Sequence, residues 1–179
     1  MSIYLIDNND SFTRNLEHIL FKIWQKPLTI ISYEDLQIKQ IKDGDTVIIS
    51  PGPGNPAMYP KYKQLFKKNI CILGVCLGMQ IINEAFGGKT KPLKTCLHGK
   101  TDTIIFKNKK YVVARYHSLY TSNISKNFKI IATNQEKIPM IIENKIKPIL
   151  AYQFHPESFL TKQGEIFIKY AYDLFQKNN

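Results

Sequence analysis

The chain has 179 residues, of which 44% are hydrophobic, and it carries a formal net charge of +11 with only three cysteines. This length predicts a single domain, residues 1–179, with its own hydrophobic core. The chain lacks the run of about 18 apolar residues that a membrane span needs, and acidic residues follow the N-terminus too soon for a signal peptide. We therefore expect a cytoplasmic protein with no membrane partner.

The positive charge permits a nucleic-acid partner, but its distribution argues against one. Only two of the 25 basic residues are arginine, Arg14 and Arg115, and the lysines are scattered. Because no basic stripe alternates with aromatic residues, we predict a solvated surface and no nucleic-acid partner. The cysteines lack paired metal-ligand spacing, which argues against a disulfide framework and a zinc site. We expect no metal and no cofactor.

Strand-like and helix-like segments alternate through the first half of the chain. Apolar or β-branched runs predict strands at residues 3–6, 29–31, 46–50 and 70–73. Helices are predicted over residues 16–23, after the candidate caps Asp10 and Ser11, and at residues 34–41, 60–68 and 77–86. This alternation predicts an α/β fold in which a parallel sheet binds ligands at the carboxyl ends of its strands.

The second half of the chain has a different pattern. Strand-like segments at residues 103–106, 111–114, 129–132 and 149–154 follow one another with little helix between them. Residues 164–175 have the apolar face of a closing amphipathic helix. We therefore expect an open, mostly parallel sheet with a mixed or antiparallel extension and with helices on both faces.

The segment Gly-Val-Cys-Leu-Gly at residues 74–78 lies where an apolar strand gives way to a helix. It has the form of a nucleophile elbow with cysteine in the place of serine, and its two glycines allow a sharp turn. A helix N-terminus also favours a thiolate. We predict that Cys76 is a nucleophile, with a buried structural cysteine as the alternative. Cys71 lies within a strand and is expected in the core, and Cys96 has no such context.

The sequence His155-Pro156-Glu157 follows a strand-like segment. Residues i and i+2 of an extended chain point to one side, so Glu157 is placed to bind one ring nitrogen of His155 while the other faces a thiol. Pro156 is expected to end the strand and stiffen this geometry. Alone, the pattern is weak and more often describes a surface turn. Together with the cysteine elbow it predicts a nucleophile, a base and an orienting carboxylate.

Residues 50–56, Ser-Pro-Gly-Pro-Gly-Asn-Pro, directly follow a predicted strand. Glycines let backbone N–H groups approach a ligand, which suits an oxyanion hole combined with the N–H of Leu77. A rigid Pro/Gly turn is the alternative interpretation. The segment lacks the lysine and the spacing of a P-loop, which disfavours nucleotide binding. His117 lies in an apolar neighbourhood and is interpreted as a hydrogen-bonded structural residue.

These segments together resemble the class I (triad) glutamine amidotransferases, and within them the glutaminase components of anthranilate synthase and aminodeoxychorismate synthase. Nearly the whole chain takes part, through residues 5–13, 50–56, 74–80, 98–100, 115–119 and 153–158. Met79 departs from the histidine usual in these relatives, and Asn9 departs from a common aromatic residue. The stretch from residue 101 to 111 is shorter than expected.

The resemblance implies that Cys76 forms a γ-glutamyl thioester, that His155 transfers the proton and that Glu157 orients His155. It also implies that the backbone N–H groups of Gly52 and Leu77 bind the oxyanion. The residues implied to contact the substrate L-glutamine are Gly52, Gly54, Leu77, Gln80, Ser118 and Leu119.

The implied partner is a chorismate-converting synthase subunit in a heterodimer or heterotetramer. It would use the ammonia to form anthranilate or 4-amino-4-deoxychorismate, and His98-Gly99-Lys100 is expected to face it. Three alternatives stay open. They are a non-catalytic regulatory module of the same fold, the glutaminase component of another amidotransferase, and a cysteine hydrolase that acts on another amide.

Overall fold

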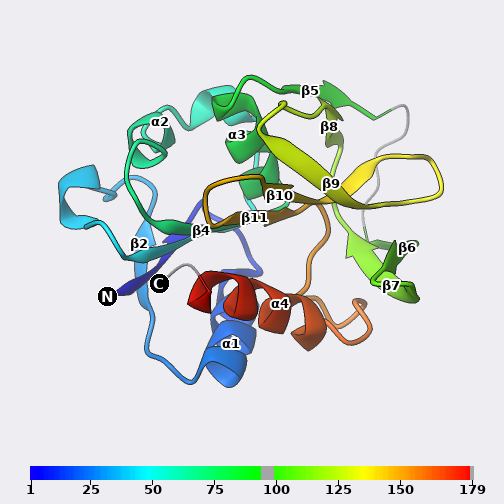
Figure 1. Ribbon diagram of the computed structural model, residues 1–179, viewed down its shortest axis with the longest axis horizontal. Coiled ribbons are helices and arrows are strands. Elements are labelled where there is room, and N and C mark those ends of the chain that lie inside the picture. Colours follow the sequence, from blue (N-terminus) through cyan, green and yellow to red (C-terminus); the bar gives the residue numbers. More distant parts are fainter. Residues whose placement is uncertain (94–98, 178–179) are drawn as a thin grey trace.

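A computed structural model describes residues 1–93 and 99–177, and its main feature is a seven-stranded sheet (Figure 1). The strand order is β2-β1-β3-β4-β11-β10-β9. Strands β2, β1, β3, β4 and β11 are parallel neighbours, and β10 is antiparallel to both β11 and β9. The bounds are β1 Ile3–Asp7, β2 Thr29–Ser32, β3 Thr46–Ile49, β4 Cys71–Val75, β9 Phe128–Thr133, β10 Pro139–Asn144 and β11 Ile149–Tyr152. The predicted open, mostly parallel sheet with an antiparallel extension is confirmed.

Helices cover both faces of this sheet, as expected (Figure 1). Helices α1 (Thr13–Trp24) and α4 (Glu165–Gln176) pack side by side on one face. Helix α3 (Leu77–Ala85) and the short α2 (Tyr62–Leu65) cover the other face. None of the helices in the described ranges has the length and apolar run that crossing a bilayer requires.

The alternation of side chains along each strand divides the core into two layers. In β3, Ile48 packs in the layer beneath α1 and α4, whereas Val47 and Ile49 pack in the layer beneath α2 and α3. Helix α1 contributes Leu16 and Leu20, four residues apart on one face. Because both faces are covered, β3 and β4 are buried at every position, so their apolar runs do not alternate with polar residues.

Two small antiparallel sheets extend from this framework. One pairs β5 (Lys89–Pro92) with β8 (Leu119–Asn123), and the other pairs β6 (Lys100–Phe106) with β7 (Lys109–Arg115). The connection from β7 to β8 runs past the carboxyl ends of the parallel strands and supplies one wall of the site described below.

The predicted helix at residues 34–41 is wrong. This stretch contains only a single 3-10 turn, η1 (Ile38–Gln40), and the residues on both sides of it, Gln37 and Ile41, have extended backbone angles. Eight residues are too few to form a helix without a packed apolar face. Leu36 and Ile41 both reach the core, but their spacing of five does not place them on one face of a helix.

Other boundaries differ in smaller ways. The helix predicted at 60–68 is reduced to α2. The N-cap of α1 lies one residue after the predicted caps, at Phe12, which makes no side-chain cap hydrogen bond. Asp10 instead accepts the N–H of Phe12 at 2.8 Å. Strands β5, β8 and β10 were not predicted, and β5 consists of lysine, threonine and proline with little burial, so it lacks a strand pattern.

Candidate active site

Cys76 occupies the sharp turn between β4 and α3. Its backbone angles are φ 53° and ψ −102°, a region that a residue with a side chain rarely adopts. The turn is held because the Cys76 N–H donates to the carbonyl of Tyr152 at 2.7 Å and the Cys76 carbonyl accepts from Met79 at 3.1 Å. Strain of this kind costs about 1–3 kcal/mol and is concentrated at functional sites.

The two glycines around Cys76 are required by close packing. A Cβ atom on Gly78 would lie 2.4 Å from the carbonyl oxygen of Ile49, and one on Gly74 would lie 2.7 Å from the carbonyl carbon of Gly78. Helix α3 therefore begins directly against the ends of β3 and β4. The expectation that the elbow needs small neighbours is confirmed.

His155 and Glu157 form a hydrogen-bonded pair. The Nδ1 of His155 donates to Oε1 of Glu157 at 2.7 Å, and both side chains are buried. The expected contact is present, but the expected extended geometry is wrong. Strand β11 has ended at Tyr152, and residues 155–158 form a turn in which the N–H of Ser158 donates to the carbonyl of His155 at 3.3 Å. Pro156 occupies the second position of this turn, which suits its fixed φ angle.

The electrostatics of the pair favour a charged imidazole. Burial lowers the pKa of His155, but the charges of Glu157 and Cys76 outweigh it and raise this pKa well above 6.5. The sulfur is near enough to exert this effect, yet Nε2 of His155 has no partner in hydrogen-bond geometry within the described part of the chain. Catalytic hydrogen bonds are often unformed before substrate binds.

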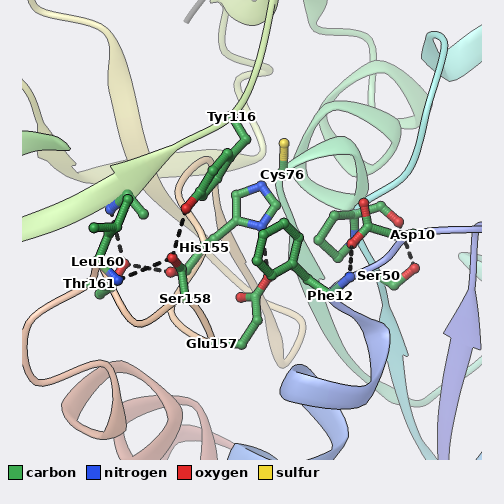
Figure 2. Close-up of polar contacts among 12 residues, drawn as sticks. Asp10, Phe12, Ser50, Cys76, Tyr116, His155, Glu157, Ser158, Leu160 and Thr161 are labelled. Atoms are coloured by element: carbon green, nitrogen blue, oxygen red, sulfur yellow. Dashed lines mark hydrogen bonds and ion pairs between the residues drawn. The ribbon is translucent and has the colours of Figure 1, made fainter. Parts of the chain in front are cut away.

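Two aromatic rings flank the imidazole of His155. Phe12 lies 5.6 Å and Tyr116 lies 5.0 Å from it, between ring centroids and in edge-on arrangements. Figure 2 shows the imidazole ring between Phe12 and Tyr116, with Cys76 above it and Glu157 below. The hydroxyl of Tyr116 is 3.1 Å from that of Ser158, which anchors one ring. These contacts restrict the orientation of His155, and no role for either ring was assigned from the sequence.

Cys76 opens onto a cavity of about 480 Å³ at the carboxyl ends of the parallel strands. The six residues expected to contact glutamine all line this cavity: Gly52, Gly54, Leu77, Gln80, Ser118 and Leu119. Asp10 lies in the same wall, and burial raises its pKa. A larger hollow of about 880 Å³ lies beside β8 and the β9–β10 turn, but its described lining contains neither cysteine nor histidine. The smaller cavity is therefore the one onto which the candidate nucleophile opens.

The loop that follows β3 is held rigidly against the elbow. The backbone N–H of Asn8 donates to Oγ of Ser50 at 2.9 Å, and its side-chain amide donates to the carbonyl of Ser50 at 2.8 Å. Tyr62 in turn donates its hydroxyl to Asn8 at 2.7 Å. A Cβ atom on Gly52 would lie 2.6 Å from Asn8 and 3.0 Å from the side chain of Leu77. Gly52 and the start of α3 are thus immediate neighbours.

The opposite wall is fixed by a buried chain of hydrogen bonds. Arg115 forms an ion pair with Asp102 at 2.7 Å and donates its Nε–H to Nε2 of His117 at 3.0 Å. Burial and the charge of Arg115 lower the pKa of His117 to about 3, so the ring is neutral and its Nδ1–H donates to the carbonyl of Leu119 at 2.7 Å. His117 is a hydrogen-bonded structural residue, as interpreted from the sequence.

The remaining sequence features have these positions. Met79 is completely buried in the core, whereas Asn9 lines the cavity. Cys71 is buried within β4, as expected. Cys96 and His98 lie outside the described residues. Within residues 1–93 and 99–177 no group of three or more His, Cys, Asp or Glu side chains is arranged to hold a metal ion.

One side chain beside Cys76 was not identified from the sequence. The amide of Gln153 is completely buried, and its Nε2 lies 3.8 Å from the sulfur of Cys76. A signal was available, because Gln153 is the polar residue within the otherwise apolar strand-like segment 149–154, and a polar side chain in a buried segment needs a hydrogen-bond partner.

Comparison with known proteins identifies the family. The model of the family described as "Glutamine amidotransferase class-I" matches residues 4–173. Anthranilate synthase component 2 of Helicobacter pylori is 38% identical over 186 residues, which cover 94% of this chain and 95% of that protein. The protein of the same name from Haemophilus influenzae is 38% identical, over 91% and 92% of the two chains.

A solved structure supports the fold alone. It is that of a putative GMP synthase subunit from Thermoplasma acidophilum, which superposes with a TM-score of 0.85 at 20% identity and covers 99% of this chain and 94% of that one. The match along residues 4–173 and the identity to relatives over nearly the full length show that this chain belongs to the class I glutamine amidotransferase family.

Proposed function

We propose that this protein is a glutaminase subunit that hydrolyses L-glutamine to glutamate and ammonia through a thioester on Cys76. Family membership supports the glutaminase activity. The observation that carries the assignment of residues is that Cys76, at a strained elbow, opens onto the cavity lined by all six expected binding residues, with the buried His155–Glu157 pair beside it.

In the first half of the reaction, the Cys76 thiolate attacks the side-chain amide carbon of glutamine. The carbon–nitrogen bond breaks, and the imidazolium of His155 gives its Nε2 proton to the leaving nitrogen, which departs as ammonia. A pKa of His155 raised above 6.5 keeps that proton available at neutral pH. Glu157 keeps the other ring proton on Nδ1, so Nε2 faces the sulfur.

In the second half, His155 removes a proton from water, which attacks the γ-glutamyl thioester. The carbon–sulfur bond breaks, glutamate leaves, and Cys76 returns to the thiolate. Both tetrahedral intermediates carry a negative oxygen. Leu77 is the first residue of α3, where backbone N–H groups have no carbonyl partner within the helix. With the adjacent Gly52 N–H it forms the proposed oxyanion hole.

We further propose that the ammonia passes to a chorismate-converting synthase subunit. Both relatives above are named component 2 of anthranilate synthase, which supports anthranilate formation as the partner's reaction. Formation of 4-amino-4-deoxychorismate is the alternative. We expect a low activity for the isolated chain, because unpartnered hydrolysis would waste glutamine and because binding energy from a partner can stabilise a competent arrangement of the site over an idle one.

The triad assignment is tested by substitution of each cysteine. Cys76→Ser should abolish glutamate release, while Cys71→Ser and Cys96→Ser, as matched controls, should retain most of it. A glutamine-analogue alkylator should label Cys76 alone, as located by peptide mass spectrometry. Stoichiometric labelling at Cys71 or Cys96, or glutamate release by Cys76→Ser, would refute the assignment and favour a non-catalytic module or another hydrolase.

The partner is tested separately, by measuring glutamate release by the chain alone and with candidate synthase subunits, with and without chorismate. We expect slow release by the chain alone and faster release in the complex, since shifts of about 1 Å change rates by roughly 10²-fold. Full activity alone, unchanged by every subunit that demonstrably binds, would instead indicate a free-standing glutaminase.

A further inference from the structure

Gln153 contacts the reactive sulfur from the interior of the protein. It follows β11, directly beside the elbow, because β11 and β4 are parallel neighbours with Tyr152 opposite Val75. Its side chain is completely buried, its Nε2 lies 3.8 Å from Sγ of Cys76, and it is not among the described residues that line the cavity. Gln153 therefore approaches the sulfur from the side away from the substrate.

The orientation of the Gln153 amide is determined by its neighbours. The carbonyl oxygen of Leu119 can only accept hydrogen bonds, so the nitrogen of the Gln80 amide must face it, at 3.0 Å. That nitrogen carries a second hydrogen, which it donates to Oε1 of Gln153 at 3.4 Å. If the Gln153 amide were reversed, two donors would face each other. Nε2 of Gln153 is thereby directed to Cys76 as a donor.

The series of hydrogen bonds that orients Gln153 starts at the ion pair between Arg115 and Asp102. The carbonyl of Leu119 also accepts from His117, whose ring stays neutral because its pKa is about 3, and His117 is held in turn by Arg115. A continuous series of hydrogen bonds thus leads from the Arg115–Asp102 ion pair through Leu119 and Gln80 to Gln153. The donor aimed at the sulfur keeps its direction over the working pH range.

We propose that Gln153 donates an N–H to the sulfur of Cys76 and thereby stabilises and aims the thiolate, acting as a positioning residue for the nucleophile. The inference rests on the proposed role of Cys76. An N–H directed at a sulfur interacts more strongly with the anion than with the neutral thiol. Gln153 therefore contacts the sulfur from within the protein before substrate binds, independently of the charge of His155.

The test is the pH dependence of Cys76 alkylation by iodoacetamide, without glutamine, in the full chain. Peptide mass spectrometry separates labelling of Cys76 from that of the other cysteines. Gln153→Met removes the donor at nearly constant volume, and the exposed Gln64→Met is the matched control. The midpoint should rise by about one pH unit in Gln153→Met relative to Gln64→Met, so that at pH values below both midpoints Cys76 is alkylated about tenfold more slowly.

A second variant and a kinetic measurement complete the test. Gln153→Glu retains the shape of the side chain but places a carboxylate against the sulfur. The midpoint of Cys76 alkylation should therefore rise further than in Gln153→Met. This variant replaces Gln153→Met in the test if Gln153→Met does not fold. In the complex with a synthase subunit, Gln153→Met should have a lower kcat at neutral pH. Its kcat should return toward that of the unsubstituted protein at alkaline pH, with KM unchanged. Midpoints equal to that of Gln64→Met in folded Gln153 variants would overturn the proposal. Absence of glutaminase activity in the unsubstituted protein would refute the proposed function alone, because the alkylation curve needs no turnover.

Discussion

The elbow glycine Gly78 offers the sharpest test of how packing positions the nucleophile. In Gly78→Ala the new Cβ would lie 2.4 Å from the carbonyl oxygen of Ile49, where ordinary contacts begin at 3.4 Å. The start of α3 must therefore move away from β3 by about 1 Å, and it carries the Leu77 N–H with it. Overpacking of this kind costs about 1–3 kcal/mol, and a displacement of about 1 Å lowers rates by roughly 10²-fold.

Gly44→Ala is the matched control. Gly44 also disfavours a side chain, because its φ is +86°. A Cβ atom there would meet nothing within 4 Å, however. The residue precedes β3, at the end of the strands away from the site. It should lose about 1 kcal/mol of stability through backbone strain alone and retain kcat. Urea denaturation and glutamate release in the synthase complex measure the two quantities. A folded Gly78→Ala protein with unchanged kcat would refute the link between this contact and the oxyanion donor.

Three further predictions concern buried charges. Glu157→Gln should lower kcat on the order of 10⁴-fold with KM for glutamine nearly unchanged, as measured by steady-state kinetics. Although burial lowers the pKa of His155, Glu157 and Cys76 raise it well above 6.5. Its protonation therefore stabilises the fold fully below that pH, and this contribution is lost as pH rises through the folded-state pKa. The free energy of unfolding should accordingly decline above pH 6.5, and less steeply in Glu157→Gln. Asp102→Asn removes the nearer carboxylate from the buried Arg115 and leaves it only the exposed Glu136 at 4.0 Å, so it should cost about 3 kcal/mol. Glu17→Gln at the exposed Arg14–Glu17 pair should cost under about 1 kcal/mol.

Local patterns were sufficient for the features that depend on a few consecutive residues. The buried parallel strands were predicted from their apolar runs, and the elbow was predicted from glycines two residues on either side of Cys76. The contact between His155 and Glu157 was also predicted, although a turn makes it instead of an extended strand. Strand β5 was not predicted because its lysines and proline carry no apolar pattern, and it forms through pairing with β8.

The tertiary structure decided which residues meet around the sulfur. Cys76 and Gln153 are 77 residues apart and come together because β11 inserts beside β4 in the sheet. Phe12 reaches His155 from the N-cap of α1, and the β7–β8 connection brings Tyr116 to the other side of the ring. No local periodicity contains this information, because it depends on strand order and on which chain ends share an edge of the sheet. The sequence by itself predicted the family, which the similarity to known proteins confirms, and it predicted Cys76, His155 and Glu157 as the triad. Only long-range packing decided which other side chains surround these three residues.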